Sequence, residues 1–133
     1  MNFRINIALI IILTSTLLLS CSKSVEKKIA GTWKVEDVKF ETAKQIAPDK
    51  LESSKESAKA VKYELLEDKT AKIHVGSTTL EGNWTFKEAE SGVYMVFKGS
   101  FDTVLIGRYA DNKLINEANR PDIKIITIFI KEE

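Results

Sequence analysis

The chain has 133 residues, with 20 Lys and Arg against 19 Asp and Glu, one Cys and one His. A single cysteine excludes an internal disulfide framework, and one Cys with one His excludes a zinc site built from these two residue types. The formal net charge of +1 gives none of the basic excess typical of nucleic-acid-binding proteins, so we expect no nucleic-acid partner.

The first 20 residues have the layout of a secretory signal. Arg4 supplies a positive start, an unbroken apolar run covers residues 7–13, and the chain turns polar at Ser22. Polar residues 14–16 interrupt the apolar stretch, whereas a spanning helix needs about 20 apolar residues. We therefore assign residues 1–20 to a signal peptide.

The end of this segment, Leu18-Leu19-Ser20-Cys21, resembles the lipobox of bacterial lipoproteins, in which the cysteine becomes the lipid-bearing first residue of the mature chain. The alternatives are a plain signal peptide with an incidental cysteine, or an uncleaved anchor. Each buried acyl methylene contributes about 0.8 kcal/mol, so several chains on Cys21 would hold the protein on a membrane. We expect residues 21–28 to be a lipidated tether, and the protein to lie in the cell envelope, on the outer membrane facing the periplasm.

Residues 29–133 contain short apolar runs separated by turn residues, which is typical of a β-domain. The predicted strands cover residues 32–40, 61–66, 71–75, 80–86, 93–97, 101–108, 113–116 and 123–130. In the first strand the alternation slips at Glu36-Asp37, which predicts a β-bulge. About eight strands in one small domain predict an all-β, eight-stranded, antiparallel up-and-down barrel.

Two segments depart from simple alternation. Residues 48–60 begin with proline and place Glu52 and Lys55 at helical spacing, which predicts a short helix after the first strand. A disordered insertion is the alternative, because the segment offers little apolar surface. The last strand, residues 123–130, is apolar on both faces, so we expect one face on the core and the other under a covering element.

Gly31-Thr32-Trp33, at the start of the first predicted strand, resembles the G-x-W signature of lipocalins, and Gly82-Asn83-Trp84 repeats it. With the lipobox, the chain looks like the small lipocalin-like lipoproteins of bacteria. The resemblance implies that Gly31 allows a close entry into the barrel, that Trp33 plugs its closed end, and that Trp84 packs similarly. Residues 107–111 do not match the late loop motif of that family. Arg108 or Lys124 would have to replace the arginine that packs across the tryptophan.

Nothing in the sequence indicates catalysis. His74 lies on the outward face of its predicted strand, and a general base needs a partner and a pocket. The remaining enzyme hypothesis would use carboxylates alone, with Glu64, Glu67 and Asp68 as the candidates. We expect a non-enzymatic protein with no catalytic residue, cofactor or metal.

Binding is the remaining route to function, and the barrel interior is the expected place. Eight strands enclose a space that is either filled by side chains or holds one small ligand. The predicted inward side chains are Val35, Phe40, Tyr63, Ile73, Trp84, Phe86, Met95, Phe97 and Leu105. Of these, a ligand-binding calyx would be lined by Phe40, Tyr63, Trp84, Phe86, Met95 and Phe97, with Tyr63 as its polar handle.

The same residues are compatible with a filled core. In that case we expect an interaction or inhibitor module that engages another envelope protein. Its exposed apolar patch would be formed by Tyr94, Val96, Val104 and Ile106, which fall opposite the inward set.

Overall fold

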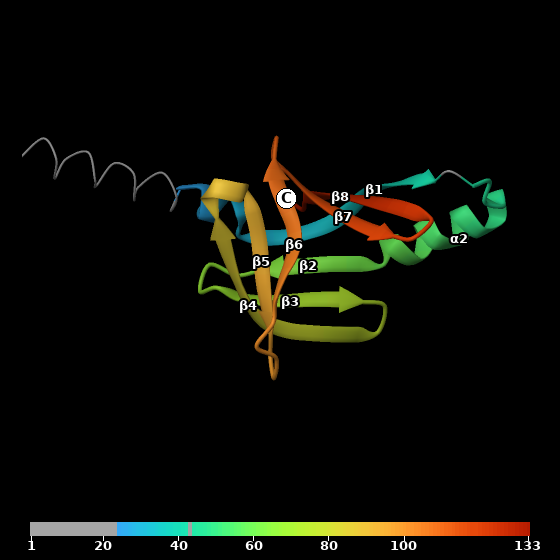
Figure 1. Ribbon diagram of the computed structural model, residues 1–133. Coiled ribbons are helices and arrows are strands. Elements are labelled where there is room, and N and C mark those ends of the chain that lie inside the picture. The colour runs from blue at the N-terminus through green and yellow to red at the C-terminus, as the bar shows by residue number, and fades with distance from the viewer. Residues whose placement is uncertain (1–23, 43) are drawn as a thin grey trace, which may run out of the picture.

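The computed structural model describes residues 24–42 and 44–133 and shows eight antiparallel strands, each paired with the next (Figure 1). The eighth strand returns to the first, which closes the barrel. The elements are β1 (Gly31–Thr42), α2 (Pro48–Lys59), β2 (Val61–Leu65), β3 (Thr70–Val75), β4 (Thr78–Lys87), η1 (Glu88–Glu90), β5 (Gly92–Phe97), β6 (Thr103–Ala110), β7 (Lys113–Arg120) and β8 (Ile123–Lys131). The predicted up-and-down barrel with one short helix after the first strand is confirmed. The predicted signal peptide and Cys21 lie outside the described residues.

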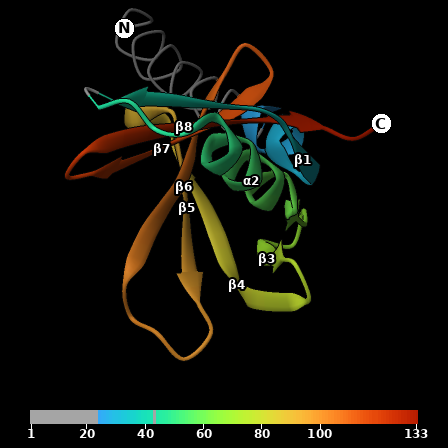
Figure 2. The ribbon, with the colours of Figure 1, turned by 90° about the vertical axis from the view of Figure 1, so that its right-hand side faces the viewer.

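The predicted helix is also confirmed as α2. Proline occupies its first turn, where a missing backbone N–H is not needed, and Asp49 and Lys59 stand at the ends that the helix dipole favours. No residue of α2 is buried, so the helix lies at the surface (Figure 2).

The bulge predicted at Glu36-Asp37 is confirmed, because the register between β1 and β8 shifts between Val35 and Asp37. The extra residue turns Val38 back to the interior, where it is fully buried opposite Thr127.

A second bulge was not predicted, and it reverses two side-chain assignments. Val93 pairs with Gly107 and Tyr94 with Leu105, so Ile106 is the extra residue in β6. Ile106 is therefore buried, whereas Leu105 shares the outer face with Tyr94. The predictions that Leu105 faces inward and Ile106 outward are wrong for this reason.

The barrel has two different ends. The N-terminal helix of residues 24–29, the β2–β3 turn, η1 and the β6–β7 turn lie at one end, which we call the closed end. Helix α2 and the β3–β4, β5–β6 and β7–β8 turns lie at the other, which we call the mouth. The buried core is concentrated toward the closed end and consists of Ile29, Ala30, Trp33, Tyr63, Leu65, Ala71, Ile73, Trp84, Val93, Met95, Ile106, Leu114 and Phe129.

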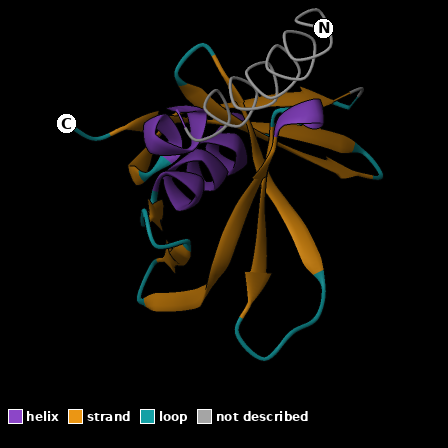
Figure 3. Cartoon of the chain, turned by 90° about the vertical axis from the view of Figure 1, so that its left-hand side faces the viewer, coloured by secondary structure: helices purple, strands orange, loops and turns teal. Residues whose placement is uncertain are grey.

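The strands separate toward the mouth. β6 and β7 pair only from Arg108 to Ala110 and from Lys113 to Ile115, so the β5–β6 hairpin diverges from the β7–β8 hairpin (Figures 1 and 2). The β5–β6 hairpin consequently projects with its loop away from the rest of the sheet (Figure 3).

The second apolar face of β8 does not lie under α2, as a covering element would. Ile126, Ile128 and Ile130 share the outer face with residues of β1 such as Lys39, and each remains half-buried. Helix α2 contacts β1 and β2 instead. The covering element expected over this face is therefore not α2.

Candidate functional site

A cavity of about 500 Å³ lies at the mouth, between α2 and the inner faces of β1, β7 and β8. Phe40 and Ile125 are register partners two residues from the pair formed by the buried Val38 and the half-buried Thr127, so their side chains continue the inner face toward the opening. Ile123 lies one step further out, and Leu51 and Ala58 of α2 form the opposite wall. Ligand pockets commonly measure about 300–1,000 Å³, so this cavity has a suitable size.

The inner face stays apolar on the other side of the mouth, but it is not covered. Val75, Leu80 and Val104 are 46%, 43% and 42% exposed. Leu80 is the register partner of Ile73 and Val104 that of Met95, both of which are buried in the core. The barrel therefore presents apolar inner surface to solvent at one end.

The polar groups at the mouth cavity are basic or neutral. Lys50 on α2 and Arg120 at the end of β7 both line it, and no acidic side chain does. Two acids of the β7–β8 hairpin pair with lysines outside the cavity lining, Asp122 with Lys44 at 3.2 Å and Glu117 with Lys124 at 3.3 Å.

The closed end is tightly packed around Trp33. This side chain is 1% exposed, its Nε1 donates to the Ile29 carbonyl at 2.8 Å, and the Tyr109 ring meets it edge-on with centroids 6.3 Å apart. Gly31 has a φ of 145°, and a Cβ there would lie 2.3 Å from Lys131 Cε. Trp33 thus fills the closed end of the barrel, and Gly31 has a backbone conformation that favours glycine.

Neither cation expected across Trp33 is bonded there. Arg108 donates to the Glu90 carbonyl at 2.9 Å, and Lys124 pairs with acidic residues on β1 and β7. Lys131 is the residue directly opposite Trp33 in the β1–β8 register. Its Nζ donates to the Lys28 carbonyl at 3.0 Å, which fastens the end of the N-terminal helix to β8.

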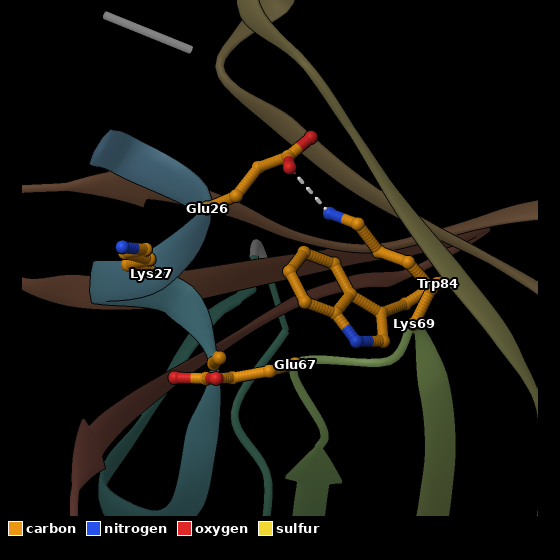
Figure 4. A pocket seen from close by; sticks show the side chains of 6 residues that line it. Glu26, Lys27, Glu67, Lys69 and Trp84 are labelled. Atoms are coloured by element: carbon orange, nitrogen blue, oxygen red, sulfur yellow. Dashed lines mark ion pairs between the residues drawn. The ribbon is translucent and has the colours of Figure 1, made fainter. Parts of the chain in front are cut away.

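Trp84 forms the floor of a smaller cavity of about 260 Å³ beside the N-terminal helix (Figure 4). Its Nε1 donates to the Leu66 carbonyl at 2.8 Å, and Lys69 Nζ lies 4.1 Å above the ring. Lys69 in turn pairs with Glu26 at 2.6 Å. The described part of the predicted tether is thus helical and bonded to the barrel.

Tyr63, the predicted polar handle, belongs to the packed core. Its ring stacks on Phe129 with centroids 4.3 Å apart, and its hydroxyl donates to the Ile106 carbonyl at 3.3 Å. Asn116 donates to the same carbonyl at 3.1 Å. Burial raises the pKa of the Tyr63 phenol. The bulge therefore supplies the acceptor that a buried phenol needs.

The other predicted lining residues divide between the two ends. Met95 and Trp84 are fully buried, and Phe86 and Phe97 are half-buried against the core. Phe40 is the one member of the set that lines the mouth cavity. Sequence alternation placed these side chains on the inner face. It did not indicate which of them lie in the packed core and which lie beyond it, at the mouth. It also missed the α2 wall and the two cations.

The candidate catalytic side chains have separate structural partners. His74 Nδ1 is 2.9 Å from Thr79 Oγ1 and its Nε2 is 3.4 Å from Glu64, all at the barrel surface. Asp68 accepts hydrogen bonds from the backbone and hydroxyl of Thr70, which lower its pKa. Glu67 lines the small closed-end cavity. Across residues 24–42 and 44–133, no group of three or more His, Cys, Asp or Glu is placed to hold a metal.

The predicted outer patch is not continuous. Tyr94 and Val96 are half-exposed, but Ile106 is buried and Val104 lies on the inner face opposite Met95. The bulge in β6 causes the split. Phe101, on the β5–β6 loop, is instead fully exposed.

No protein-family model and no curated protein sequence matches the chain. Among solved structures, the chain is similar to the crystal structure of a DUF4847 family protein from Bacteroides vulgatus, with 17% sequence identity and a TM-score of 0.49. The match covers 78% of this chain and 95% of that one. None of the helices in the described part is both long and apolar enough to cross a membrane.

Proposed function

We propose that this protein is a non-enzymatic, lipid-anchored barrel of the bacterial cell envelope that binds a small hydrophobic ligand at its mouth. The observation that carries the proposal is the uneven filling of the barrel. The inner face is packed around Trp33 and Met95, whereas at the mouth it surrounds a cavity of about 500 Å³ walled by Phe40, Ile125 and Leu51.

The anchor rests on the sequence. The lipobox-like segment ending at Cys21 supplies the lipid site, and the membrane is then a partner through the acyl chains. Mass spectrometry of the chain isolated from bacterial envelopes tests this part. An acyl-modified Cys21 at the N-terminus is expected, and an unmodified cysteine there would contradict it.

The ligand site is tested on the chain from Ser22 onward, which contains all eight strands and every buried core residue. N-phenylnaphthylamine, a neutral dye that fluoresces in apolar surroundings, is the probe, and native mass spectrometry before and after solvent extraction checks for a co-purified molecule. Phe40→Ser should weaken dye binding, because it places a hydroxyl in the cavity wall. Phe101→Ser is the matched control, since that side chain is fully exposed. Absence of both dye binding and a co-purified molecule would contradict the proposal.

A second function, docking of another envelope protein, is favoured by one observation. Phe101 is fully exposed on the β5–β6 loop, where an aromatic side chain could act as the anchor of a protein–protein contact. Under this alternative, Phe101→Ser would abolish capture of a partner from envelope extracts while Phe40→Ser would not.

A further inference from the structure

The charged side chains that line the mouth cavity are both basic. Lys50 comes from α2 and Arg120 from β7, so the two cations approach the cavity from opposite walls. Arg120 is the register partner of Ile123, which places it on the inner face and not on the outer surface of β7. The described part of the chain offers neither cation a salt-bridge partner, although other lysines at this end have one.

The cavity lining also includes hydroxyl groups. Ser53, Ser54 and Ser57 on α2 also line the cavity, and Ser57 donates to the Ser53 carbonyl at 3.0 Å. The helix thus turns a polar, uncharged strip toward an opening whose floor is Phe40 and Ile125. A cavity with an apolar floor and a basic, hydroxylated rim is complementary to a molecule with an apolar tail and an anionic head.

We propose that the ligand is an anionic amphiphile, a single acyl or alkyl chain with a carboxylate or phosphate head. Its tail contacts Phe40, Ile123, Ile125 and Leu51, and its head pairs with Arg120 and Lys50. Arg120 offers the paired N–H donors that bind a carboxylate or phosphate in two-point fashion, and Lys50 adds a second charge. The inference rests on the proposed ligand-binding function and specifies its ligand class.

The test compares four twelve-carbon probes with different heads: dodecanoate, dodecyl phosphate, dodecanol and dodecylamine. Each is tested for displacing N-phenylnaphthylamine from the chain beginning at Ser22, at concentrations below its micelle or solubility limit. We expect one or both anions to bind about tenfold more tightly than dodecanol, as a charge-assisted hydrogen bond implies, and the amine to bind most weakly. Binding by one anion alone identifies the head as carboxylate or phosphate.

Charge-removing variants locate the head. Arg120→Gln combined with Lys50→Gln should reduce the preference for anions over dodecanol to near unity while leaving dodecanol and dye affinity unchanged. Lys59→Gln is the matched control, because it removes a charge from the last turn of the same helix without touching the cavity lining. Thermal unfolding of all variants confirms that the barrel is intact.

The outcomes separate the two proposals. Dye binding with equal affinity for dodecanol and both anions, or tightest binding of dodecylamine, would overturn the anionic ligand and leave the hydrophobic site standing. An anion preference that survives the double substitution would overturn the assigned head-group residues. Failure of the wild-type chain to bind the dye or any probe would overturn the proposed function, and this inference with it.

Discussion

The closed end and the mouth are built from the same eight strands, yet they differ in what covers their inner faces. At the closed end, the helix of residues 24–29 places Ile29 under Trp33, and hydrogen bonds from Trp33 and Lys131 hold that helix in place. At the mouth, α2 has no buried residue, and a cavity lies between it and the inner face of the barrel. The N-terminal helix seals its end with the fully buried Ile29, whereas α2 contributes no buried side chain. We therefore expect substitutions to affect stability strongly at one end and weakly at the other.

The largest effect is expected at the closed-end plug. Trp33→Ala removes a 1% exposed indole and its bond to Ile29, and should lower the free energy of unfolding by about 3–5 kcal/mol. Urea unfolding measures it. Phe101→Ala is the reference at the mouth, where full exposure predicts a change within about 0.5 kcal/mol. Equal costs at both sites would contradict the difference between the ends.

A smaller loss is expected at Gly82, the glycine of the second G-x-W. A Cβ there would lie 2.1 Å from the Val96 carbonyl oxygen and 2.9 Å from Met95 Cε, so Gly82→Ala must shift β5 and should cost about 1–3 kcal/mol. Gly107→Ala is the control, because its nearest neighbour would be at 3.5 Å. If urea unfolding finds both variants equally stable, β4 and β5 do not approach as closely as described.

Tyr63 gives the packed core a dependence on pH. The phenol ionises near pH 10.0 in the unfolded chain, and burial raises its pKa in the folded barrel. Below pH 10 the phenol is protonated in both states, whereas above it the unfolded chain loses the proton first, so stability falls as pH rises. Tyr63→Phe should lose about 1 kcal/mol at neutral pH and then decline less steeply than wild type above pH 10. Urea unfolding at pH 8 and pH 10.5 compares them, and parallel declines would show that Tyr63 is not the group responsible.

The smallest effect is expected from Leu51 on α2. Leu51→Ser changes a half-exposed side chain at the edge of a cavity, so stability should fall by no more than about 0.5 kcal/mol, while dye affinity falls measurably. A stability loss comparable with that of Trp33→Ala would mean that α2 seals the mouth as the N-terminal helix seals the other end.

The sequence predicted the elements well because each carries a local signal. Alternation identified the strands, Pro48 marked the start of α2, and the phase slip at Glu36-Asp37 identified the first bulge. The second bulge could not be found in this way, because the sequence of Leu105, Ile106 and Gly107 shows no break in alternation. Only the register with β5 identifies Ile106 as the extra residue.

The candidate site was harder to predict, because it depends on tertiary placement. Phe40 was expected on the inner face, but its partners Lys50 and Leu51 come from the helix, and the sequence does not show that they meet Phe40 around one cavity. Arg120 precedes Pro121 at a turn, where a charged residue is ordinary. Only the register with Ile123 places it on the inner face.

The short pairing between β6 and β7 has a consequence for the backbone itself. From Thr103 to Gly107 on one strand and from Asn116 to Arg120 on the other, the two strands are not register partners, so both have a free edge toward the mouth. One carbonyl on this edge, that of Ile106, is capped by side chains from Tyr63 and Asn116. The other backbone N–H and C=O groups on these two edges have no partner strand, as at the border of an open sheet. Their amide hydrogens should therefore exchange with solvent sooner than those of the β1–β8 pair. A barrel that is closed by topology therefore has the protection pattern of an open sheet along one side.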